Sequence, residues 1–402
     1  MKSTISFIIK SHLADDGAPL VGGSSKNPYR LVKYLSRRAK IARVIYFDGQ
    51  HTGLEPYTAH RFRTPFLKLY FKTIYQNVVA LPSVYRAFRD ADIVQCHHPH
   101  FGMGAALLRK FVFRNKRLIV KAHGTAFPEV KANKYRGAKG AILALNAAAH
   151  RWHDRYVLKS ADIVLCSSNF QRAEMTTIYR AAPDRVKTVY NGYDAEYLSR
   201  AAKNRDATGA RHFVFCGRVV PKKGALYAIA LFGKLSRDRT DDRLTLVLGL
   251  KTEIEDVSTY AKICAAVAGD HRISVVHGLT ESELYSTFQR ATVGFIPSVE
   301  YESIPTVLIE MMATGLPVFA TNKWGVPELL PQHFGLSGEL EEDCKMIGTF
   351  LGGAQIAAPC RLPSGMHIDD LSYDSLVEKY LEIYRAITGQ KTENRKSQPP
   401  RN

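Results

Sequence analysis

The sequence has few cysteines and no pair of them spaced for metal binding. Six cysteines are spread over 402 residues, and no Cys-x-x-Cys pair occurs among them. Three of them end short apolar runs, where cysteine acts as a small hydrophobic residue. A disulfide scaffold or a zinc site is therefore not expected, and the pattern fits a reducing cytoplasm.

Long hydrophobic runs are also missing. The opening MKSTISFIIK holds too short an apolar run for the core of a signal peptide, and no small-residue cleavage site follows. No stretch of roughly 18 apolar residues occurs, so no helix is expected to span a membrane. We therefore expect a cytoplasmic protein, either free or bound peripherally to the inner face of the cell membrane.

Negative charge is scarce in the first half of the chain. Residues 1–200 carry 33 Lys and Arg against 13 Asp and Glu, whereas residues 201–402 carry 23 against 24. This asymmetry indicates an anionic partner for the first half, or a solubilising basic surface. Cations and aromatic residues alternate in residues 60–72 and 107–117, as they do in segments that bind anionic bilayers. We hypothesise that residues 60–117 bind an anionic membrane surface; the alternative is aromatic side chains buried in core helices.

Two classes of protein lack their motifs here. No Gly-x-Gly-x-x-Gly follows a predicted strand, which argues against a nicotinamide oxidoreductase. No common nucleic-acid recognition motif occurs, so nucleic acid is not an expected partner, although a basic or nucleic-acid-binding protein stays the alternative. The run His97-His98-Pro99-His100 has no acidic or cysteine ligand near it. Its consecutive side chains would point to opposite faces, so we favour a place in an interdomain cleft over a metal site.

Short apolar, β-rich runs alternate with helical patterns along the whole chain, which is typical of parallel sheets covered by helices. The length favours two domains, since a domain has about 100–200 residues. We expect an α/β fold of two doubly wound, Rossmann-like domains that face each other across a cleft, with ligands beyond the carboxyl ends of the strands. The expected parts are a first domain of residues 1–195 completed by a helix at 371–389, a linker at 196–209, a second domain at 210–370 and a disordered tail at 390–402.

The expected elements follow from these patterns. Strands are expected at residues 5–9, 44–47, 93–96, 118–122, 163–166, 186–190, 213–216, 244–248, 273–276, 293–296 and 318–320. Helices are expected at residues 28–40, 141–159, 223–235, 281–290, 304–313 and 371–387.

The second domain opens with a strand, a glycine turn and several cations before a helix. Gly217 ends the strand, and Arg218 and Lys223 flank the start of the next helix. A helix N-terminus favours an anion, and a guanidinium with an ammonium adds a site for a diphosphate. An ordinary surface loop could have the same composition, so these residues alone leave both interpretations open.

Two glutamates flank the start of another helix in this domain. Glu302 lies in the loop after strand 293–296, and Glu310 lies within the helix. The amides of residues 303–306 could hold phosphates while Glu310 accepts hydrogen bonds from ribose hydroxyls, as acidic residues do in nucleotide-binding folds. Exposed glutamates on helices are common, so the pair alone is a weak signal.

Taken together, the motifs resemble those of the retaining glycosyltransferases of family 4, also called group 1, which have the GT-B fold. Glu302 and Glu310 match the E-x7-E of that family, and Gly217-Arg218 with Lys223-Gly224 match its GR…KG phosphate element. Further matches are Gly22-Gly23 to its glycine-rich first loop, His123-Gly124 to its HG, and Asn191-Gly192-Tyr193-Asp194 to its NG.D. The closing GG.PE departs from the pattern, because Trp324 stands in place of the first glycine before Gly325-Val326-Pro327-Glu328.

The resemblance implies a retaining, hexosyltransferase-type enzyme that moves a sugar from a nucleoside-diphosphate sugar to a glycan or lipid-linked acceptor, in surface polysaccharide or glycolipid synthesis. It implies no metal and no other cofactor, because Arg218 and Lys223 would stabilise the leaving diphosphate. Another GT-B enzyme, such as a sugar-nucleotide epimerase, is the alternative.

The resemblance also assigns roles to residues. Glu302 would contact the transferred sugar, Glu310 the ribose, and His123 would lie near the reacting carbon or the 6-hydroxyl of the sugar. The implied catalytic residues are thus His123, Arg218, Lys223 and Glu302. The implied donor-binding residues are Gly22, Gly23, Arg218, Lys223, Gly278, Glu302, Ser303, Ile304, Pro305, Thr306 and Glu310, and the candidates on the acceptor side are His98 and Lys121.

Overall fold

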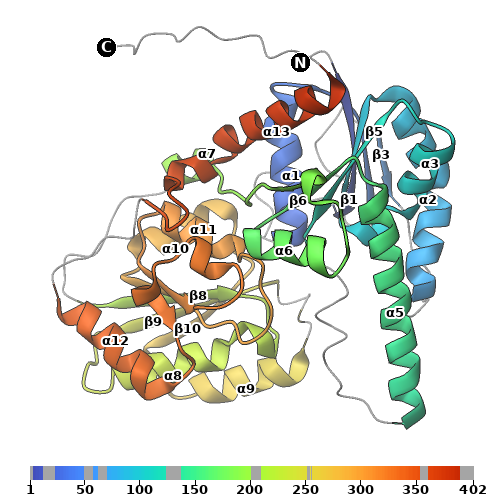
Figure 1. Cartoon of the computed structure of the whole chain (residues 1–402). Coiled ribbons are helices and arrows are strands. Elements are labelled where there is room, and N and C mark those ends of the chain that lie inside the picture. The colour runs from blue at the N-terminus through green and yellow to red at the C-terminus, as the bar shows by residue number, and fades with distance from the viewer. Residues whose placement is uncertain are drawn as a thin grey trace, which may run out of the picture.

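The computed structural model describes residues 3–11, 23–48, 58–61, 70–123, 137–200, 210–250, 254, 256–353 and 361–389. These residues form two α/β domains, each built on a parallel sheet covered by helices (Figure 1). The expected fold of two doubly wound, Rossmann-like domains is confirmed.

The first domain contains a seven-stranded sheet in the order β3-β2-β1-β4-β5-β6-β7. Its strands are β1 (Thr4–Ser11), β2 (Lys40–Asp48), β3 (Thr58–Arg61), β4 (Ile93–His97), β5 (Arg117–Ala122), β6 (Ile163–Cys166) and β7 (Val186–Thr188). Its helices are α1 (Gly23–Ser36), α2 (Tyr70–Asp90), α3 (Met103–Phe111), α5 (Gly137–Ser160) and α6 (Asn169–Thr177). The short helix α7 (Ala195–Arg200) follows this domain and packs against α10 (Glu281–Arg290) of the second domain. The central strands β4 and β5 are buried along their length except for the half-buried Arg117, as expected of a parallel sheet covered on both faces.

The second domain contains a six-stranded sheet in the order β10-β9-β8-β11-β12-β13. Its strands are β8 (His212–Gly217), β9 (Arg243–Leu248), β10 (Ile273–His277), β11 (Val293–Ile296), β12 (Val318–Thr321) and β13 (Gly335–Leu336). Its helices are α8 (Ala225–Leu235), α9 (Val257–Val267), α10 (Glu281–Arg290), α11 (Thr306–Ala313) and α12 (Leu340–Gly352).

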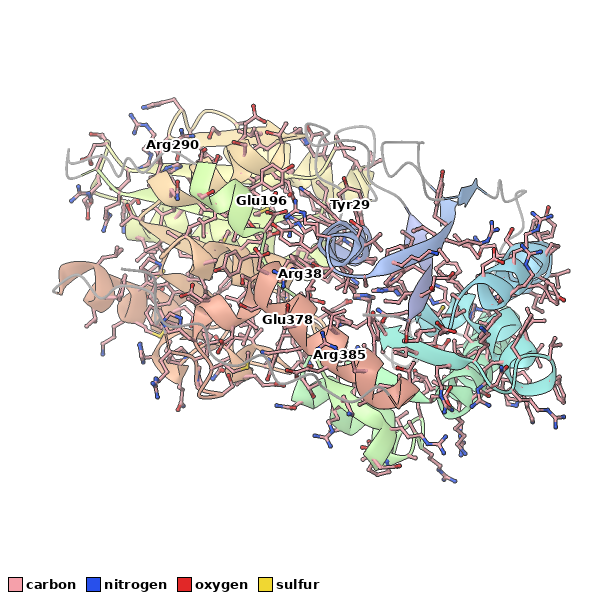
Figure 2. The ribbon with its side chains drawn as sticks, turned by 90° about the horizontal axis from the view of Figure 1, so that it is seen from above. Tyr29, Arg38, Glu196, Arg290, Glu378 and Arg385 are labelled. Atoms are coloured by element: carbon pink, nitrogen blue, oxygen red, sulfur yellow. The ribbon has the colours of Figure 1, made fainter. Side chains whose placement is uncertain are left out.

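The last helix, α13 (Tyr373–Thr388), returns to the first domain and packs beside α1 (Figures 1 and 2). Its apolar stripe shares one core with α1 and the first sheet, whereas α2, α3 and α5 cover the opposite face of that sheet. Arg38 and Glu378, labelled in Figure 2, form an ion pair with 2.5 Å between Nη1 and Oε1 where the end of α1 meets α13.

Each sheet has a point where the strand order reverses. In the first sheet β1 lies between β2 and β4, and in the second sheet β8 lies between β9 and β11. The loops that leave the two central strands at such a point diverge toward opposite faces, so they leave room for a ligand. The second reversal lies where the loops after β8 and β11 meet, and these loops carry the GR…KG and E-x7-E motifs.

The structure differs from the expected elements in several places. The helices α9 and α12 were not expected, and α1 spans Gly23–Ser36 rather than residues 28–40 because Lys40 begins β2. The edge strands β3 and β13 were not expected, because β3 reads Thr-Ala-His-Arg and β13 has two residues. The first part of the expected linker at 196–209 is helical: Ala195–Arg200 forms α7, and Asp194 Oδ1 accepts a hydrogen bond from Glu196 N at 3.0 Å. Residues 201–209 and the tail at 390–402 lie outside the described residues.

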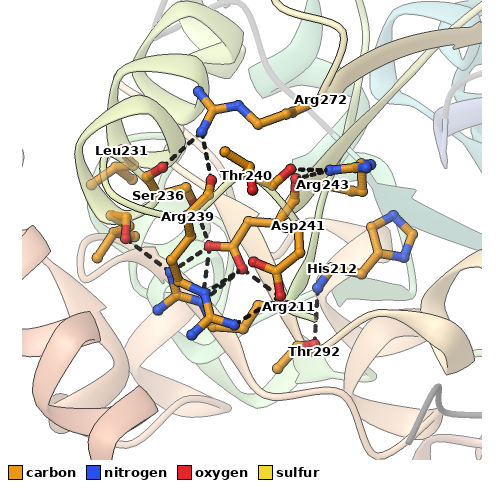
Figure 3. A network of polar contacts seen from close by, with 12 residues as sticks. Arg211, His212, Leu231, Ser236, Arg239, Thr240, Asp241, Arg243, Arg272 and Thr292 are labelled. Carbon is orange, nitrogen blue, oxygen red and sulfur yellow. Dashed lines mark hydrogen bonds and ion pairs between the residues drawn. The ribbon is translucent and has the colours of Figure 1, made fainter. Parts of the chain in front are cut away.

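A buried carboxylate ties together the ends of β8 and β9 that lie away from the site. Asp242 has no exposed surface, and its oxygens accept hydrogen bonds from Ser236 Oγ at 2.5 Å and Arg239 Nε at 3.0 Å (Figure 3). Arg211 Nε donates to the same carboxylate at 2.9 Å, and Arg272 Nη1 donates to the carbonyl of Ser236 at 2.7 Å. This network fixes the strands whose other ends carry the site.

Candidate functional site

The loops after β8 and β11 are joined by their backbones. Val299 N donates to the carbonyl of Lys222 at 2.9 Å. Gly224 has φ 74°, and a Cβ atom there would lie 2.0 Å from the carbonyl oxygen of Pro297. Only glycine therefore fits where the two loops cross, which explains the glycine of the GR…KG element.

This crossing brings Lys223 and Glu302 together in an ion pair between Lys223 Nζ and Glu302 Oε1. Both side chains are mostly buried, with 17% and 15% of their surfaces exposed. Arg218 follows directly after β8 on the same loop and is exposed. The structure thus places a cation and a carboxylate at the strand reversal, with a second cation a few residues away on the same loop.

The segment between the two glutamates is held against the first domain. Ser303 Oγ lies 2.8 Å from Ser168 Oγ, and Thr306 Oγ1 accepts a hydrogen bond from Asn27 Nδ2 at 2.8 Å. Ile304 is buried, and Pro305 has no N–H, so this residue cannot supply an amide to a phosphate. Helix α11 begins at Thr306, which makes Glu310 its fifth residue, little more than one turn from the start of the helix.

Glu310 is buried beneath α1 of the first domain. Its Oε1 lies 2.5 Å from Lys26 Nζ and 2.8 Å from Arg30 Nη1, and 1% of the residue is exposed. Burial by itself would raise the pKa of this carboxyl, but the two cations hold it below its usual value. Glu310 is therefore an ionised carboxylate at the interface between the domains.

Glu281, the first residue of α10, completes a cluster of two cations and two carboxylates. Arg30 Nη2 pairs with Glu281 Oε1, and Lys26 Nζ lies 3.6 Å from the same oxygen. Sequence reasoning missed Lys26, Arg30 and Glu281. The available signal was the four-residue spacing of the two cations, which puts them on one face of the helix after the glycine-rich loop.

In the first domain, His97, His98 and His123 lie at the carboxyl ends of the neighbouring strands β4 and β5, and two of them, His98 and His123, are predicted site residues. His123 is half-buried, and its Nε2 lies 2.8 Å from His97 Nδ1. His98 is buried with φ 81°, a left-handed conformation that is uncommon for histidine, and its ring centroid lies 5.0 Å from that of His123. Such strained residues gather at functional sites.

Lys121, the other acceptor-side candidate, is fully buried. Its ammonium donates a hydrogen bond to the carbonyl of Val189 and lies 5.8 Å from the centroid of the Tyr380 ring. Burial lowers its pKa to about 7. In this arrangement the ammonium is enclosed by protein groups, so it would have to be uncovered to meet an acceptor.

The predicted glycines lie at three places. Gly23 is the first residue of α1, and Gly22 and Gly124 lie outside the described residues. Gly278 follows β10 with φ 65°. In the described residues no hydrogen bond or ion pair joins His123 to Lys223 or Glu302.

The tryptophan of the GG.PE segment has a backbone conformation that favours glycine. Trp324 has φ 59°, the left-handed conformation that a glycine would adopt freely, and a Cβ atom on Gly325 would lie 1.6 Å from the carbonyl oxygen of Ser303. The carboxylate of Glu328 accepts hydrogen bonds from the amides of Asn169 and Phe170, both at 2.8 Å. A residue of the second domain therefore caps α6 of the first.

Two features do not occur in the described residues. No group of three or more His, Cys, Asp or Glu side chains could hold a metal ion within the described part of the chain. None of the helices described is both long and apolar enough to cross a membrane.

Two families match consecutive parts of the chain. Glycosyltransferase Family 4 matches residues 21–197, and Glycosyl transferases group 1 matches residues 199–346. Alpha-maltose-1-phosphate synthase of Mycobacterium tuberculosis is 26% identical over 262 residues, which are 59% of this chain and 66% of that protein, slightly under two thirds. D-inositol 3-phosphate glycosyltransferase 1 of Catenulispora acidiphila is 25% identical over 322 residues, which are 76% of this chain and 74% of that protein.

Solved structures share the whole architecture. The sucrose-phosphate synthase of Thermosynechococcus elongatus has a TM-score of 0.69 at 17% identity, covering 97% of this chain and 100% of that one. HepE of Anabaena, solved in complex with UDP and glucose, has a TM-score of 0.68 at 17% identity, covering 96% of this chain and 100% of that one. These likenesses establish the fold, and the family matches establish the class. The chain belongs to the group 1 glycosyltransferases of family 4 and has the GT-B fold.

Proposed function

We propose that this glycosyltransferase moves a sugar from a nucleoside-diphosphate sugar to a glycan or lipid-linked acceptor, with retention of the anomeric configuration, in the synthesis of surface polysaccharide or glycolipid. The observation that carries the proposal is the pairing of Lys223 with Glu302 where the loops after β8 and β11 cross. Retention is supported by the E-x7-E match of Glu302 and Glu310 to the retaining enzymes of this family.

The proposed chemistry is electrostatic. Lys223 has three N–H donors, so it can keep Glu302 and still bind a phosphate oxygen, and Arg218 adds a two-pronged donor from the same loop. Both cations would stabilise the negative charge that grows on the diphosphate as the sugar leaves. A donor placed on such a charge contributes about 10²–10³ in rate. The two cations would thus take the part that a metal ion has in other glycosyltransferases.

Glu310 adds a condition on donor binding. Its carboxylate is covered by Lys26 and Arg30, so a ribose can reach it only when α1 shifts away from α11. We therefore propose that donor binding exchanges the contact between Glu310 and α1 for a contact between Glu310 and the ribose.

Nucleotide binding and product analysis test this function. Thermal shift compares UDP, GDP and ADP. All three are needed because HepE was solved with UDP, but its likeness to this chain shows the fold alone and does not identify the base. The base that stabilises the protein then guides a screen of donor sugars, and NMR of the product reports the anomeric configuration. Stabilisation by none of the three nucleotides would defeat the proposal, and an inverted product would defeat retention.

We further propose that the acceptor is reached at an anionic membrane through the α2–α3 surface, defined as Val78, Tyr85, Arg86, Lys110, Phe111, Val112 and Arg114. Phe111 and Val112 are 60% and 54% exposed at the end of α3, and Lys110 Nζ lies 5.3 Å from the centroid of the Phe111 ring. Exposed apolar side chains among cations suit the headgroup region of such bilayers. Residues 62–69 of the hypothesised membrane segment lie outside the described residues.

Vesicle flotation tests the membrane proposal. The protein should float with phosphatidylglycerol vesicles and not with phosphatidylcholine vesicles. Phe111→Glu should reduce the bound fraction at least about tenfold, because it removes apolar area and adds a negative charge that the anionic lipid repels. Val257→Glu is the matched control, because Val257 is 73% exposed on α9 of the second domain. Equal flotation with both lipids, or equal loss in both variants, would contradict the proposal.

A further inference from the structure

A line of buried polar groups runs from α13 to His123. The hydroxyl of Tyr384 on α13 donates to Gln95 Oε1 at 2.6 Å, and Gln95 Nε2 lies 2.8 Å from His97 Nε2. His97 Nδ1 lies 2.8 Å from His123 Nε2. Gln95 and His97 are two residues apart on β4 and therefore share a face of the sheet. Tyr384, Gln95 and His97 are each at most 1% exposed.

The hydrogen-bond donors set the direction of this line. Within the described residues, Gln95 is the sole hydrogen-bond partner of the Tyr384 hydroxyl, whose proton needs an acceptor because it is buried. The Gln95 oxygen is that acceptor, so the Gln95 amide nitrogen faces His97. An amide nitrogen can only donate, so His97 Nε2 accepts and His97 carries its proton on Nδ1.

The same argument continues to His123. His97 Nδ1–H donates to His123 Nε2, so the proton of a neutral His123 must be on Nδ1. Burial, helped by Lys121 and the neighbouring histidines, keeps the pKa values of His97 and His123 well below their usual value. Both rings are therefore neutral at physiological pH, and each carries one N–H proton, on either Nδ1 or Nε2.

We propose that Tyr384, Gln95 and His97 are positioning residues that hold His123 in its Nδ1–H form, so that His123 offers a hydrogen-bond donor to the sugar. The inference deepens the proposed function and rests on it for the sugar as ligand. Because Nε2 is occupied by His97, His123 has no free lone pair with which to act as a general base. The C-terminal helix thus acts on the site through Tyr384, whose effect reaches His123 by way of Gln95 and His97 on β4. None of these three side chains needs to touch the substrate.

The protonation of the rings is measured directly by two-bond proton–nitrogen correlation NMR on protein labelled with ¹⁵N-histidine. The signals of His97 and His123 are assigned by their loss in His97→Asn and His123→Asn. Both residues should show a protonated Nδ1 and an unprotonated Nε2 from pH 6 to pH 8, whereas free neutral histidine favours the opposite form. A protonated Nε2 on His123 would overturn the inference, because it would mean that Gln95 faces the other way.

Activity separates positioning from packing. Tyr384→Phe removes only the hydroxyl that orients Gln95, and it should mix the two forms of His123 and lower kcat roughly tenfold with the donor KM unchanged. That loss is smaller than the ~10²–10³-fold expected for His123→Ala, which removes the donor itself. Tyr380→Phe is the matched control on α13, because Tyr380 is equally buried and makes no hydrogen bond through its hydroxyl in the described residues. An unchanged NMR pattern and kcat in Tyr384→Phe would overturn the inference.

The two proposals fail in different ways. If the chain binds no nucleoside diphosphate but shows the Nδ1–H form on His123, the glycosyl transfer is wrong and the hydrogen-bond line stands. If a nucleotide binds and sugar is transferred but His123 carries its proton on Nε2, the positioning role falls and the enzyme assignment stands.

Discussion

At the scale of single residues, the protein buries charged groups: Glu310 at the interface between the domains and Lys121 within the first domain. Glu310 stays ionised because Lys26 and Arg30 both contact its Oε1, and Lys121 is buried with a single hydrogen bond to the carbonyl of Val189. A buried charge with an oppositely charged partner is compensated, whereas a buried charge without one lowers the free energy of unfolding. Glu310 is therefore stabilised as an ion, while Lys121 disfavours its own charged form.

Lys121 gives a pH-dependent prediction. Its pKa is about 7 in the folded protein against 10.5 ordinarily, so between these values the unfolded chain binds more protons and stability rises with pH. The slope approaches about 1.4 kcal/mol per pH unit. Lys121→Met should therefore be more stable than the wild type at pH 7, and this difference should shrink by pH 10, as measured by urea unfolding. The lost bond to Val189 acts equally at both pH values, so a difference independent of pH would contradict the account.

Residue types and spacing predicted part of the site. Lys223, Glu302 and His123 could be identified because they lie in motifs that resemble those of the family. Lys26, Arg30 and Gln95 could not, since their roles depend on partners that the fold supplies: Arg30 lies 280 residues from Glu310 in sequence. The orientation of the Gln95 amide depends on Tyr384, which comes from the last helix.

At the scale of secondary-structure elements, α1 serves two domains. One face packs with α13 on the first sheet, and Lys26 and Arg30 reach α10 and α11 of the second domain. Although α9 and α12 were not expected, most apolar strands and the other amphipathic helices of the second domain were predictable from their periodicity, and α10 was predicted with its observed bounds. Polar segments were not, because β3, β13 and α7 are stabilised by pairing and capping rather than by an apolar pattern.

Substitution of Arg30 tests the buried ion cluster. Arg30→Met leaves Glu310 with one cation and should cost about 3 kcal/mol in the free energy of unfolding. Arg37→Met is the control, since the Arg37–Glu196 pair is largely exposed and should cost less than about 1 kcal/mol. If urea unfolding showed equal, small losses of the free energy of unfolding in Arg30→Met and Arg37→Met, the cluster would contribute nothing to stability.

The same variant has a defined effect on acid unfolding. The pKa of Glu310 is held below its usual 4.5 in the folded protein, so its contribution is complete above pH 4.5 and is lost as pH falls through the lowered value. Removing Arg30 raises that pKa, so the acid unfolding midpoint of Arg30→Met should lie at a higher pH than that of the wild type. A midpoint that does not move would contradict the assignment of charge to Glu310.

The network around Asp242 concerns the stability of the second sheet and not the chemistry. Asp242→Asn weakens charge-assisted hydrogen bonds from Arg211, Arg239 and Ser236 and should cost about 2 kcal/mol. Asp241→Asn is the matched control, because Asp241 is 51% exposed. Urea unfolding measures the cost, and kcat per folded molecule should stay at the wild-type value in both variants. A loss of kcat in Asp242→Asn would mean that the network shapes the site.

At the scale of the whole molecule, the two domains are joined by polar contacts around the site. Glu328 caps α6, Ser168 lies against Ser303, and Asn27 donates to Thr306. The fold could be predicted from the alternation of strands and helices, and the family resemblance identified the motifs. The closure of one domain on the other could not, because each of these contacts joins residues more than 100 positions apart.

The central claim is that the second domain binds a nucleoside diphosphate through Lys223. Isothermal titration of the nucleotide that stabilises the wild type into Lys223→Met and Lys222→Met tests it most directly, because the two lysines are neighbours and differ in their contact with Glu302. We predict that Lys223→Met weakens binding at least about tenfold, by loss of a charge-assisted hydrogen bond, while Lys222→Met binds as the wild type does. Equal affinity of the wild type and Lys223→Met would contradict the account.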